Sequence, residues 1–321
     1  MIGSRLSSEK RVFTRKQKRM TFYILMFALP LLQFLIFYIY VNFNSIIIAF
    51  QKQVDGNVSF TSKNFKTASD YFFSSKGAEM MWNSLQLLLC QLFIVTPLGL
   101  LFSYYIAKGK RGASFYRIML YLPQVLSLVV LAPLFKFIVN EVYPYIADKF
   151  FNNPNATGLL GIGASSKTIF YTALVFTLWF SFGANVLIYT GAMSGIDQSI
   201  VESAQLDGVT TMQEFWHIYL PITFPTITTF ILTSLAGIFN NQMSLHIFYG
   251  PDSNIRVFGY YFYRMASINT KSVKTLKPDE VVGQYMTLGQ LAALGLIATL
   301  ILVPLTLFAR KCLNKLGPSV E

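Results

Sequence analysis

The fold class is decided by residues 20–41, MTFYILMFALPLLQFLIFYIYV, an uncharged and largely apolar run. A bilayer core about 30 Å thick requires roughly 20 apolar residues per helix, so this run is long enough to cross a membrane. The strands of a membrane barrel would instead alternate between apolar and polar residues over about ten positions. Pro30 lies inside the run, where neighbouring groups can satisfy the carbonyl that a proline leaves free. The run therefore predicts a transmembrane helix.

The rest of the chain repeats this pattern. Of its 321 residues, 54% are hydrophobic and only 12% are charged, about half the charged fraction of a soluble domain. We expect an all-α, polytopic membrane protein with a membrane domain over residues 20–309, a basic tail over 1–19 and a second tail over 310–321. Six transmembrane helices are predicted, over residues 20–41, 80–107, 117–139, 168–193, 224–248 and 285–308.

The distribution of basic residues predicts the orientation. The net charge is +12, but seven basic residues lie in the first 19 positions, directly before the first apolar run, which indicates a membrane anchor and no nucleic-acid partner. With six spans, both termini share one side with the basic turn at 108–117 and the polar segment at 197–221. We therefore expect both termini and the polar segment in the cytoplasm.

The sequence contains no recognisable motif for catalysis, nucleotide binding or metal binding. The string nearest to a phosphate-binding loop, over residues 161–168, has Ser166 in place of the second glycine and no strand before it. Two histidines and two cysteines, Cys90 and Cys312, lie too far apart in sequence to predict a metal site or a disulfide. We predict no catalytic residues, no metal and no cofactor on this chain.

The polar segment 197–221 differs from every other loop because it has four carboxylates and neither Lys nor Arg. Gln198–Leu206 can form two helical turns, and Gly208 can take the left-handed conformation that ends a helix. A second short amphipathic helix is predicted over Thr210–His217. Pro221 suits the first turn of the next span. The segment therefore predicts a helix–turn–helix unit on the cytoplasmic surface.

This segment resembles the cytoplasmic EAA loop of ABC importer permeases. The residues that carry the resemblance are Glu202, Ser203, Ala204, Asp207, Gly208, Phe215, Leu220 and Pro221. Ser203 departs from the usual alanine, and Val209 departs from the alanine that usually follows the glycine. Further motifs resemble the carbohydrate-uptake branch, which includes the maltose and glycerol-3-phosphate permeases: Asn83-Ser84-Leu85, Leu122-Pro123, Trp179 with Gly183, Gly250-Pro251 and Tyr263-Arg264.

The resemblance implies a transmembrane permease subunit of an ATP-driven, binding-protein-dependent importer for a sugar or oligosaccharide. It implies that the EAA loop sits in a cleft of a separate ATPase subunit, which uses ATP and Mg²⁺. The implied partners are a second, homologous permease in a heterodimer, two ATPase subunits and an extracytoplasmic solute-binding protein. The implied location is the plasma (inner) membrane of a bacterium.

Polar residues inside the spans are candidates for a substrate path, because such residues usually face protein or water. They are Gln124, Ser127, Asn185, Asn240, Asn241 and Gln242. The competing interpretation is hydrogen bonding between helices. Three consecutive amides cannot all face one direction, so at most two of Asn240–Gln242 can line a path.

Two other function classes stay open at this point. A stand-alone secondary transporter or channel would use charged residues deep in the membrane. Only Lys136 comes close to such a position, and we expect its side chain to extend toward the far surface. A membrane enzyme would need a catalytic group of residues, which the sequence does not contain.

Overall fold

The computed structural model describes residues 15–54, 57–161, 163–275 and 286–317. Residues 1–14 of the predicted N-terminal tail, residue 285 of the predicted sixth span and the last four residues of the C-terminal tail lie outside the described residues. Within them, six helical segments are long and apolar enough to cross a membrane: Arg19–Ala49, Ser75–Ala107, Leu128–Phe151, Ser166–Ser194, Thr211–Ala236 and Leu288–Leu316. The prediction of an all-α protein with six transmembrane helices is confirmed.

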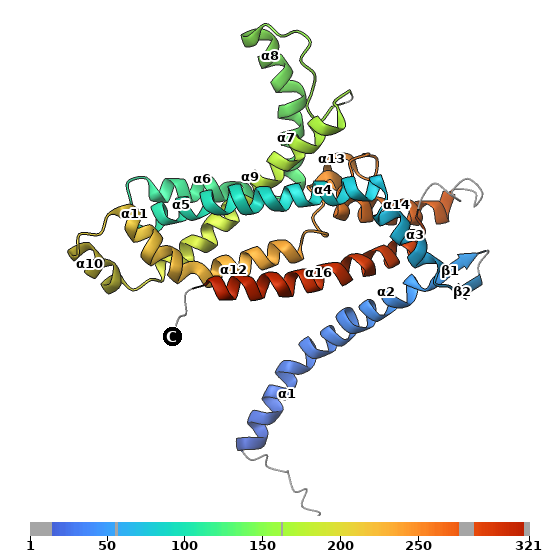
Figure 1. Ribbon diagram of the computed structural model, residues 1–321, viewed down its shortest axis with the longest axis horizontal. Helices are drawn as coiled ribbons and strands as arrows, with labels where there is room; N and C mark the ends of the chain where they lie inside the picture. Colours follow the sequence, from blue (N-terminus) through green and yellow to red (C-terminus); the bar gives the residue numbers. More distant parts are fainter. Residues whose placement is uncertain (1–14, 55–56, 162, 276–285, 318–321) are drawn as a thin grey trace, which may run out of the picture.

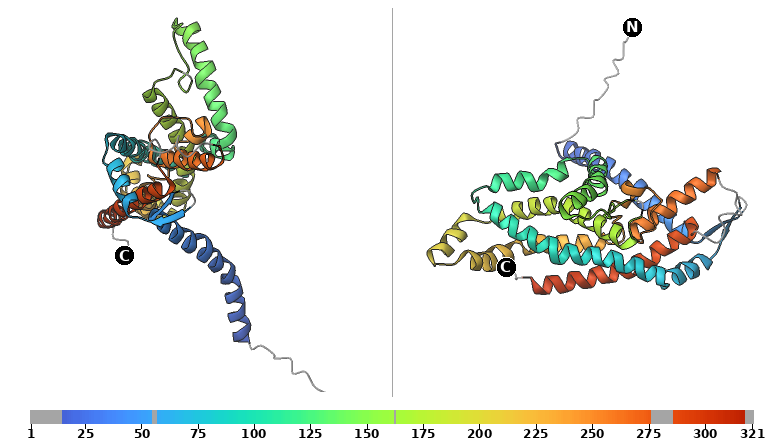
Figure 2. Two further views of the ribbon diagram at one scale, coloured as in Figure 1. Left: turned by 90° about the vertical axis from the view of Figure 1, so that its right-hand side faces the viewer. Right: turned by 90° about the horizontal axis from the view of Figure 1, so that it is seen from above.

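Most of the first span stands apart from the other helices, and its C-terminal end packs against them (Figures 1 and 2). It is a continuous helix made of α1 (Arg15–Gln33), the π-helical turn η1 (Phe34–Tyr40) and α2 (Val41–Ala49). No residue in its most apolar window is buried. A two-stranded antiparallel hairpin follows, β1 (Gln51–Val54) paired with β2 (Asn57–Phe60), and then the amphipathic helix α3 (Lys63–Phe72). The apolar surface of α1 is therefore left for lipid or for another chain.

Four long helices form the bundle (Figure 1). The first is continuous from α4 (Ser75–Cys90) through the π-helical turn η2 (Gln91–Val95) to the end of α5 (Thr96–Ala107). The other three are α9 (Ser166–Ser194), α12 (Leu220–Ala236) and α16 (Leu288–Leu316). The pairing of α5 with α9 is reinforced by Ser103, whose hydroxyl donates to the carbonyl of Val186 at 2.9 Å. At the other end, α16 packs against α2 and α3, where Asn64 donates to the carbonyls of Ala49 and Gln51.

The third predicted span, 117–139, is wrong as a single helix. Helix α6 (Ala113–Val125) ends where Leu126 and Ser127 take extended conformations, and α7 (Leu128–Phe137) starts anew. The helix then continues through the π-helical turn η3 (Ile138–Val142) into α8 (Tyr143–Phe151), inside the predicted loop 140–167. Helix α6 lies along α9, whereas α7 and α8 project away from the bundle (Figure 1).

The fifth predicted span, 224–248, is wrong in its second half. Helix α12 ends at Ala236, and residues 237–244 form turns and irregular backbone before the short helix α13 (Leu245–Tyr249). Met243 and Ser244 both have positive φ angles, 51° and 56°, which no helix accommodates. The crossing helix instead includes the end of the polar segment, since the continuous helical segment runs from Thr211 to Ala236.

The predicted loop 249–284 contains a helix of the core, α14 (Phe258–Thr275). Its buried side chains Phe258, Tyr261 and Met265 pack in one cluster with Leu291 and Leu294 of α16. Their spacing of three and four residues is that of one helix face.

Lys136 of α7 is half-buried and contacts the end of α13. Its ammonium donates to the carbonyl of Phe248 at 2.7 Å and lies 4.7 Å from the centre of the Tyr249 ring. The ammonium thus links α7 to the end of α13.

Candidate functional site

Residues 197–221 form a protrusion at one end of the bundle, which we call the knob. The end of α5 with its following turn, and the C-terminal end of α16, lie at the same end, whereas the β1–β2 hairpin and α3 lie at the other (Figure 1). The knob is made of α10 (Gln198–Leu206), α11 (Thr211–Glu214) and the π-helical turn η4 (Phe215–Tyr219), which runs directly into α12. The predicted helix–turn–helix shape is therefore present.

Helix α10 is defined at both ends by local hydrogen bonds. At its start, the carboxylate of Asp197 accepts from the backbone N–H of Ser199 at 3.0 Å, and this bond lowers the pKa of Asp197 below its ordinary value. At its end, Gly208 has a φ of +76°, its N–H donates to Gln205, and the N–H of Val209 donates to Ala204. These two bonds form a Schellman motif, which requires the left-handed conformation that glycine adopts at least cost.

Helix α11 starts with a capping box. The hydroxyl of Thr210 accepts from the N–H of Gln213, and the side chain of Gln213 accepts from the N–H of Thr210 at 2.9 Å. Two free N–H groups at the helix start are satisfied in this way. The turn between α10 and α11 is therefore fixed by the sequence on both of its sides.

The knob is attached to the bundle mainly through its second half. Phe215 and Tyr219 are buried in a cluster with Leu100 and Tyr104 of α5 and Tyr189 of α9. In α10, by contrast, Val201 is the buried side chain. An ion pair adds to this attachment: the ammonium of Lys108, just after α5, lies 2.6 and 2.7 Å from the two carboxylate oxygens of Glu214.

The outer surface of the knob is apolar and acidic. Leu206 is 90% exposed, Met212 62% and Trp216 55%. Glu202 and Asp207 are also exposed on α10 and its end. A surface of exposed large apolar side chains next to charged ones is typical of a protein-binding site.

The structure separates the eight predicted loop residues into two groups. Exposed residues are Glu202, Ser203, Asp207 and Gly208, whereas Phe215 is buried and Ala204, Leu220 and Pro221 are half-buried. The first group lies on α10 and the turn, where a partner can reach it. The second group, apart from Ala204, connects the knob to α12.

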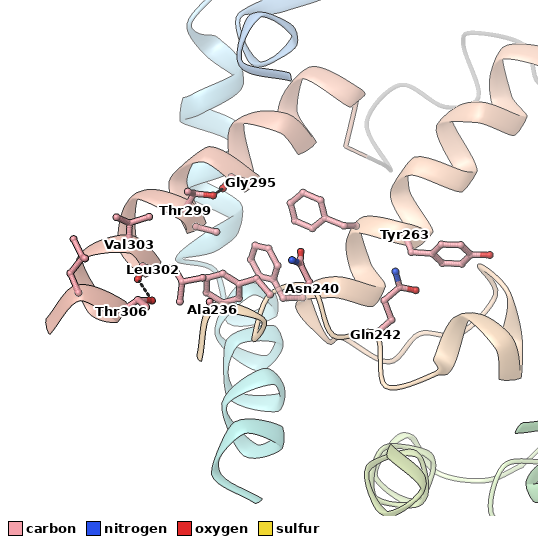
Figure 3. A pocket seen from close by; sticks show the side chains of 15 residues that line it. Ala236, Asn240, Gln242, Tyr263, Gly295, Thr299, Leu302, Val303 and Thr306 are labelled. Atoms are coloured by element: carbon pink, nitrogen blue, oxygen red, sulfur yellow. Dashed lines mark hydrogen bonds between the residues drawn. The ribbon is translucent and has the colours of Figure 1, made fainter. Parts of the chain in front are cut away.

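A cavity of about 550 Å³ lies between the end of α12, α14 and α16 (Figure 3). Two of the three consecutive amides, Asn240 and Gln242, are among its lining residues together with Tyr263 and Thr299. Asn241 is absent from the lining, and its side-chain oxygen accepts from the N–H of Met243 at 2.8 Å. The side-chain oxygen of Gln242 is buried without a hydrogen-bond partner among the described residues. Its hydrogen-bonding capacity is therefore unused among the described residues.

The other three predicted path residues do not line this cavity. Gln124 donates its side-chain N–H to the carbonyl of Phe180 and so joins α6 to α9. Ser127 is exposed at the start of α7, and Asn185 is buried on α9. Gln124 therefore makes a hydrogen bond between helices, as in the alternative to a role in the substrate path.

Sequence reasoning missed Lys108 and Glu214 as a pair and Tyr263 as a cavity residue. No sequence signal joins positions 108 and 214, which are 106 residues apart. Tyr263 ends a run of aromatic residues at 258 and 260–263, and such a continuous run does not single out one of them. Among the described residues, no group of three His, Cys, Asp or Glu side chains could hold a metal ion.

Comparison with known proteins gives a consistent result. Residues 96–319 match the family model described as the binding-protein-dependent transport system inner membrane component. The chain is 23% identical to the arabinooligosaccharides transport system permease protein AraP of Bacillus subtilis (strain 168), over 89% of this chain and 87% of that protein. It is 27% identical to the multiple sugar-binding transport system permease protein MsmF of Streptococcus mutans serotype c, over 53% of this chain and 58% of that protein.

A solved structure has the same fold. It is the crystal structure of a bacterial ABC transporter involved in the import of the acidic polysaccharide alginate, with a TM-score of 0.72 and 21% identity. The similarity covers 94% of this chain and 98% of the matched one.

Proposed function

Because the chain belongs to the family of binding-protein-dependent transport system inner membrane components, we propose that it is the transmembrane permease subunit of an ATP-driven ABC importer for a sugar or oligosaccharide. The names of its relatives support a carbohydrate substrate, since they include permeases for arabinooligosaccharides and for multiple sugars. In this proposal the chain forms half of the translocation path and hydrolyses no ATP. ATP and Mg²⁺ are bound by a separate subunit.

The observation that carries the proposal is the knob. A loop that only connects two spans has no need of two capped helices, a fixed turn and exposed Leu206, Met212 and Trp216. We propose that the knob docks into the ATPase subunit as the EAA loop. Glu202, Ser203, Ala204, Asp207 and Gly208 then contact or shape the docking surface, and Phe215, Leu220 and Pro221 join it to α12.

The cavity beside α12 is the proposed substrate path. Sugars carry many hydroxyl groups, and amide side chains can both donate to and accept from them. Asn240 and Gln242 supply such groups, and Tyr263 is also among the lining residues (Figure 3). We retain Asn241 as a residue that shapes the loop, and Ser127 and Asn185 as further candidates along the path.

The proposed assembly has a second, homologous permease, two ATPase subunits and an extracytoplasmic binding protein. The exposed part of the first span supports the second permease, because none of the residues in its most apolar window is buried in the single chain. The end of the bundle with the β1–β2 hairpin and α3 is opposite to the knob and is the proposed face for the binding protein. We place the chain in a bacterial plasma membrane with both termini and the knob in the cytoplasm.

The first test concerns the source of energy. The chain is reconstituted in proteoliposomes with its second permease, ATPase and binding protein, and uptake of labelled oligosaccharides is measured. We expect uptake only with ATP and the binding protein. Uptake by this chain alone, driven by an ion gradient, would support a stand-alone secondary transporter and would contradict the proposal.

The second test concerns the knob. Gly208→Val forces a β-branched side chain into a left-handed conformation, at a cost of about 1–2 kcal/mol, and so changes the angle between α10 and α11. We expect at least a tenfold loss of ATP-driven uptake with the protein still present in the membrane. Glu202→Lys, which reverses an exposed charge, should have the same effect.

Gly208→Asn is the matched control, because asparagine tolerates positive φ better than other non-glycine residues. The open space around Gly208, with no atom within 4 Å of an added Cβ, means that conformation and not volume separates the two variants. Equal uptake by the valine and asparagine variants would contradict the proposed role of the turn.

A further inference from the structure

The ion pair between Lys108 and Glu214 joins two elements that are distant in sequence and adjacent at the knob. Lys108 directly follows α5, and Glu214 is the last residue of α11. The ammonium contacts both carboxylate oxygens, and the side chains are only 14% and 4% exposed. The other ion pair of the described residues, Arg256–Glu79, is far more exposed, at 35% and 48%.

Aromatic contacts surround this pair. The ring of Tyr104 packs against Phe215 and Tyr219, with centroid distances of 5.2 and 4.8 Å, and its hydroxyl donates to the carbonyl of Thr211 at 3.0 Å. The Lys108 ammonium lies 6.0 Å from the same ring. One turn of α5 therefore holds α11 at its start through Thr211, and at its end through Glu214.

The two halves of the knob differ in how they are held. Helix α11 has two polar contacts to α5, whereas α10 contributes Val201 to the buried cluster and exposes Leu206 at its end. A force applied to α10 by a partner can reach α9 directly through residues 195–197, and α12 through α11 and η4. Toward α5, the ion pair and the Tyr104–Thr211 hydrogen bond are the polar links from α11.

Burial of an ion pair is a poor means of adding stability, because the desolvation of both charges offsets their attraction. Apolar residues of similar size at 108 and 214 would pack in the same aromatic surroundings. The charges instead favour one relative orientation of the two side chains, since a carboxylate that contacts an ammonium through both oxygens has one preferred arrangement. The pair therefore fixes the position of α11 relative to α5 more tightly than packing alone.

We propose that Lys108 and Glu214 are positioning residues which transmit movement of the knob to the second span, α4–η2–α5. This inference rests on the proposed function, in which an ATPase subunit moves the knob. In the wild-type chain the ion pair makes α5 follow α11 when α12 moves. Without it, α12 moves and α5 lags, so that ATP is hydrolysed with less transport.

The test measures ATP hydrolysis and oligosaccharide uptake together, in the complete transporter reconstituted in proteoliposomes. We expect Glu214→Gln and Lys108→Met each to lower the amount of sugar transported per ATP at least fivefold, with ATP hydrolysis within twofold of wild type. The exchanged pair, Lys108→Glu with Glu214→Lys, should restore at least half of the wild-type ratio, because the ion pair is re-formed in the opposite sense.

Lys110→Met is the matched control, since it removes a charge from the same turn at an exposed position. It should leave the ratio unchanged. If a single variant assembles poorly, the double variant Lys108→Met with Glu214→Gln leaves no unpaired buried charge and gives the same readout.

Two outcomes overturn the inference and differ from each other. A normal transport ratio in the neutral double variant, or no restoration by the exchanged pair in an assembled complex, means that the ion pair transmits nothing. A wild-type complex that shows no ATP-driven uptake rejects the proposed function itself, and this inference is rejected with it.

Discussion

At the scale of single residues, the close approach of α6 to α9 depends on one glycine. A Cβ on Gly183 of α9 would lie 2.0 Å from the carbonyl oxygen of Leu120 in α6. The side-chain bond from Gln124 to Phe180 lies along the same contact. Gly183 entered the sequence analysis through a resemblance alone, and the structure supplies the physical reason for a glycine there.

Gly183→Ala should destabilise the protein by separating α6 from α9. We expect a cost of about 1–3 kcal/mol, as is typical when a packed interior receives an extra carbon. The measurement is the midpoint of thermal unfolding in detergent. Gly191→Ala on the same helix is the matched control, since nothing lies within 4 Å of its added Cβ. Equal midpoints for the two variants would contradict the close approach.

Two other motif residues also have local structural reasons. Asn83 donates to the carbonyl of Arg256 at 2.8 Å, and the hydroxyl of Ser84 accepts from the N–H of Phe258 at 3.0 Å. Both bonds fix the start of α14 against α4. Side-chain bonds of this kind cannot be predicted from spacing, because their partners lie more than 170 positions away.

At the scale of elements, predictions from run length succeeded where a helix is limited by turns and caps. The second and fourth spans lie close to their predicted positions for this reason, as does α10. The sixth helix starts near its predicted position but continues to Leu316, into the predicted C-terminal tail. The third and fifth spans failed because an apolar run does not reveal a break that tertiary contacts stabilise. Helix α14 was missed because its tyrosines and Arg264 lower its hydrophobicity, although its buried face follows helical spacing.

The irregular segment between α12 and α13 has a testable role, because it brings the cavity amides into place. Gln242→Leu removes the unpartnered side-chain oxygen while keeping a similar volume. We expect the apparent KM for oligosaccharide uptake to rise at least threefold, with ATP hydrolysis unchanged.

The matched control is Gln124→Leu, whose amide bonds α6 to α9 away from the cavity. It should lower thermal stability and leave the KM of the remaining folded protein unaltered. A larger KM change for Gln124→Leu than for Gln242→Leu would contradict the assignment of the cavity.

At the scale of the whole molecule, the first span differs from the other five, because none of the residues in its most apolar window is buried in the single chain. Lipid can cover such a surface, and so can a second permease. In the proposed importer a second permease covers this surface, because a pore between two bundles needs contacts that hold them together.

A photo-reactive amino acid at Phe37, whose side chain is 69% exposed, distinguishes lipid from protein as the covering material. We expect a cross-linked product with the mass of this chain plus its homologous permease. The same variant expressed without that permease is the control and should give no such product. Cross-linking only to lipid in the complete complex would contradict a heterodimer contact at this helix.

The four π-helical turns in the described chain have one further consequence. Such a turn carries one residue more than an α-helical turn, and each residue of an α-helix contributes about 100° of rotation and 1.5 Å of length. The turn η4 lies between Glu214, which the ion pair holds, and α12, which crosses the membrane. If η4 changed to α-helical bonding, α12 would rotate by about 100° relative to α11 with both helices intact. The connection between the knob and α12 thus contains one residue more than an α-helix needs. Deletion or insertion of one residue there would rotate α12 by one residue position relative to α11.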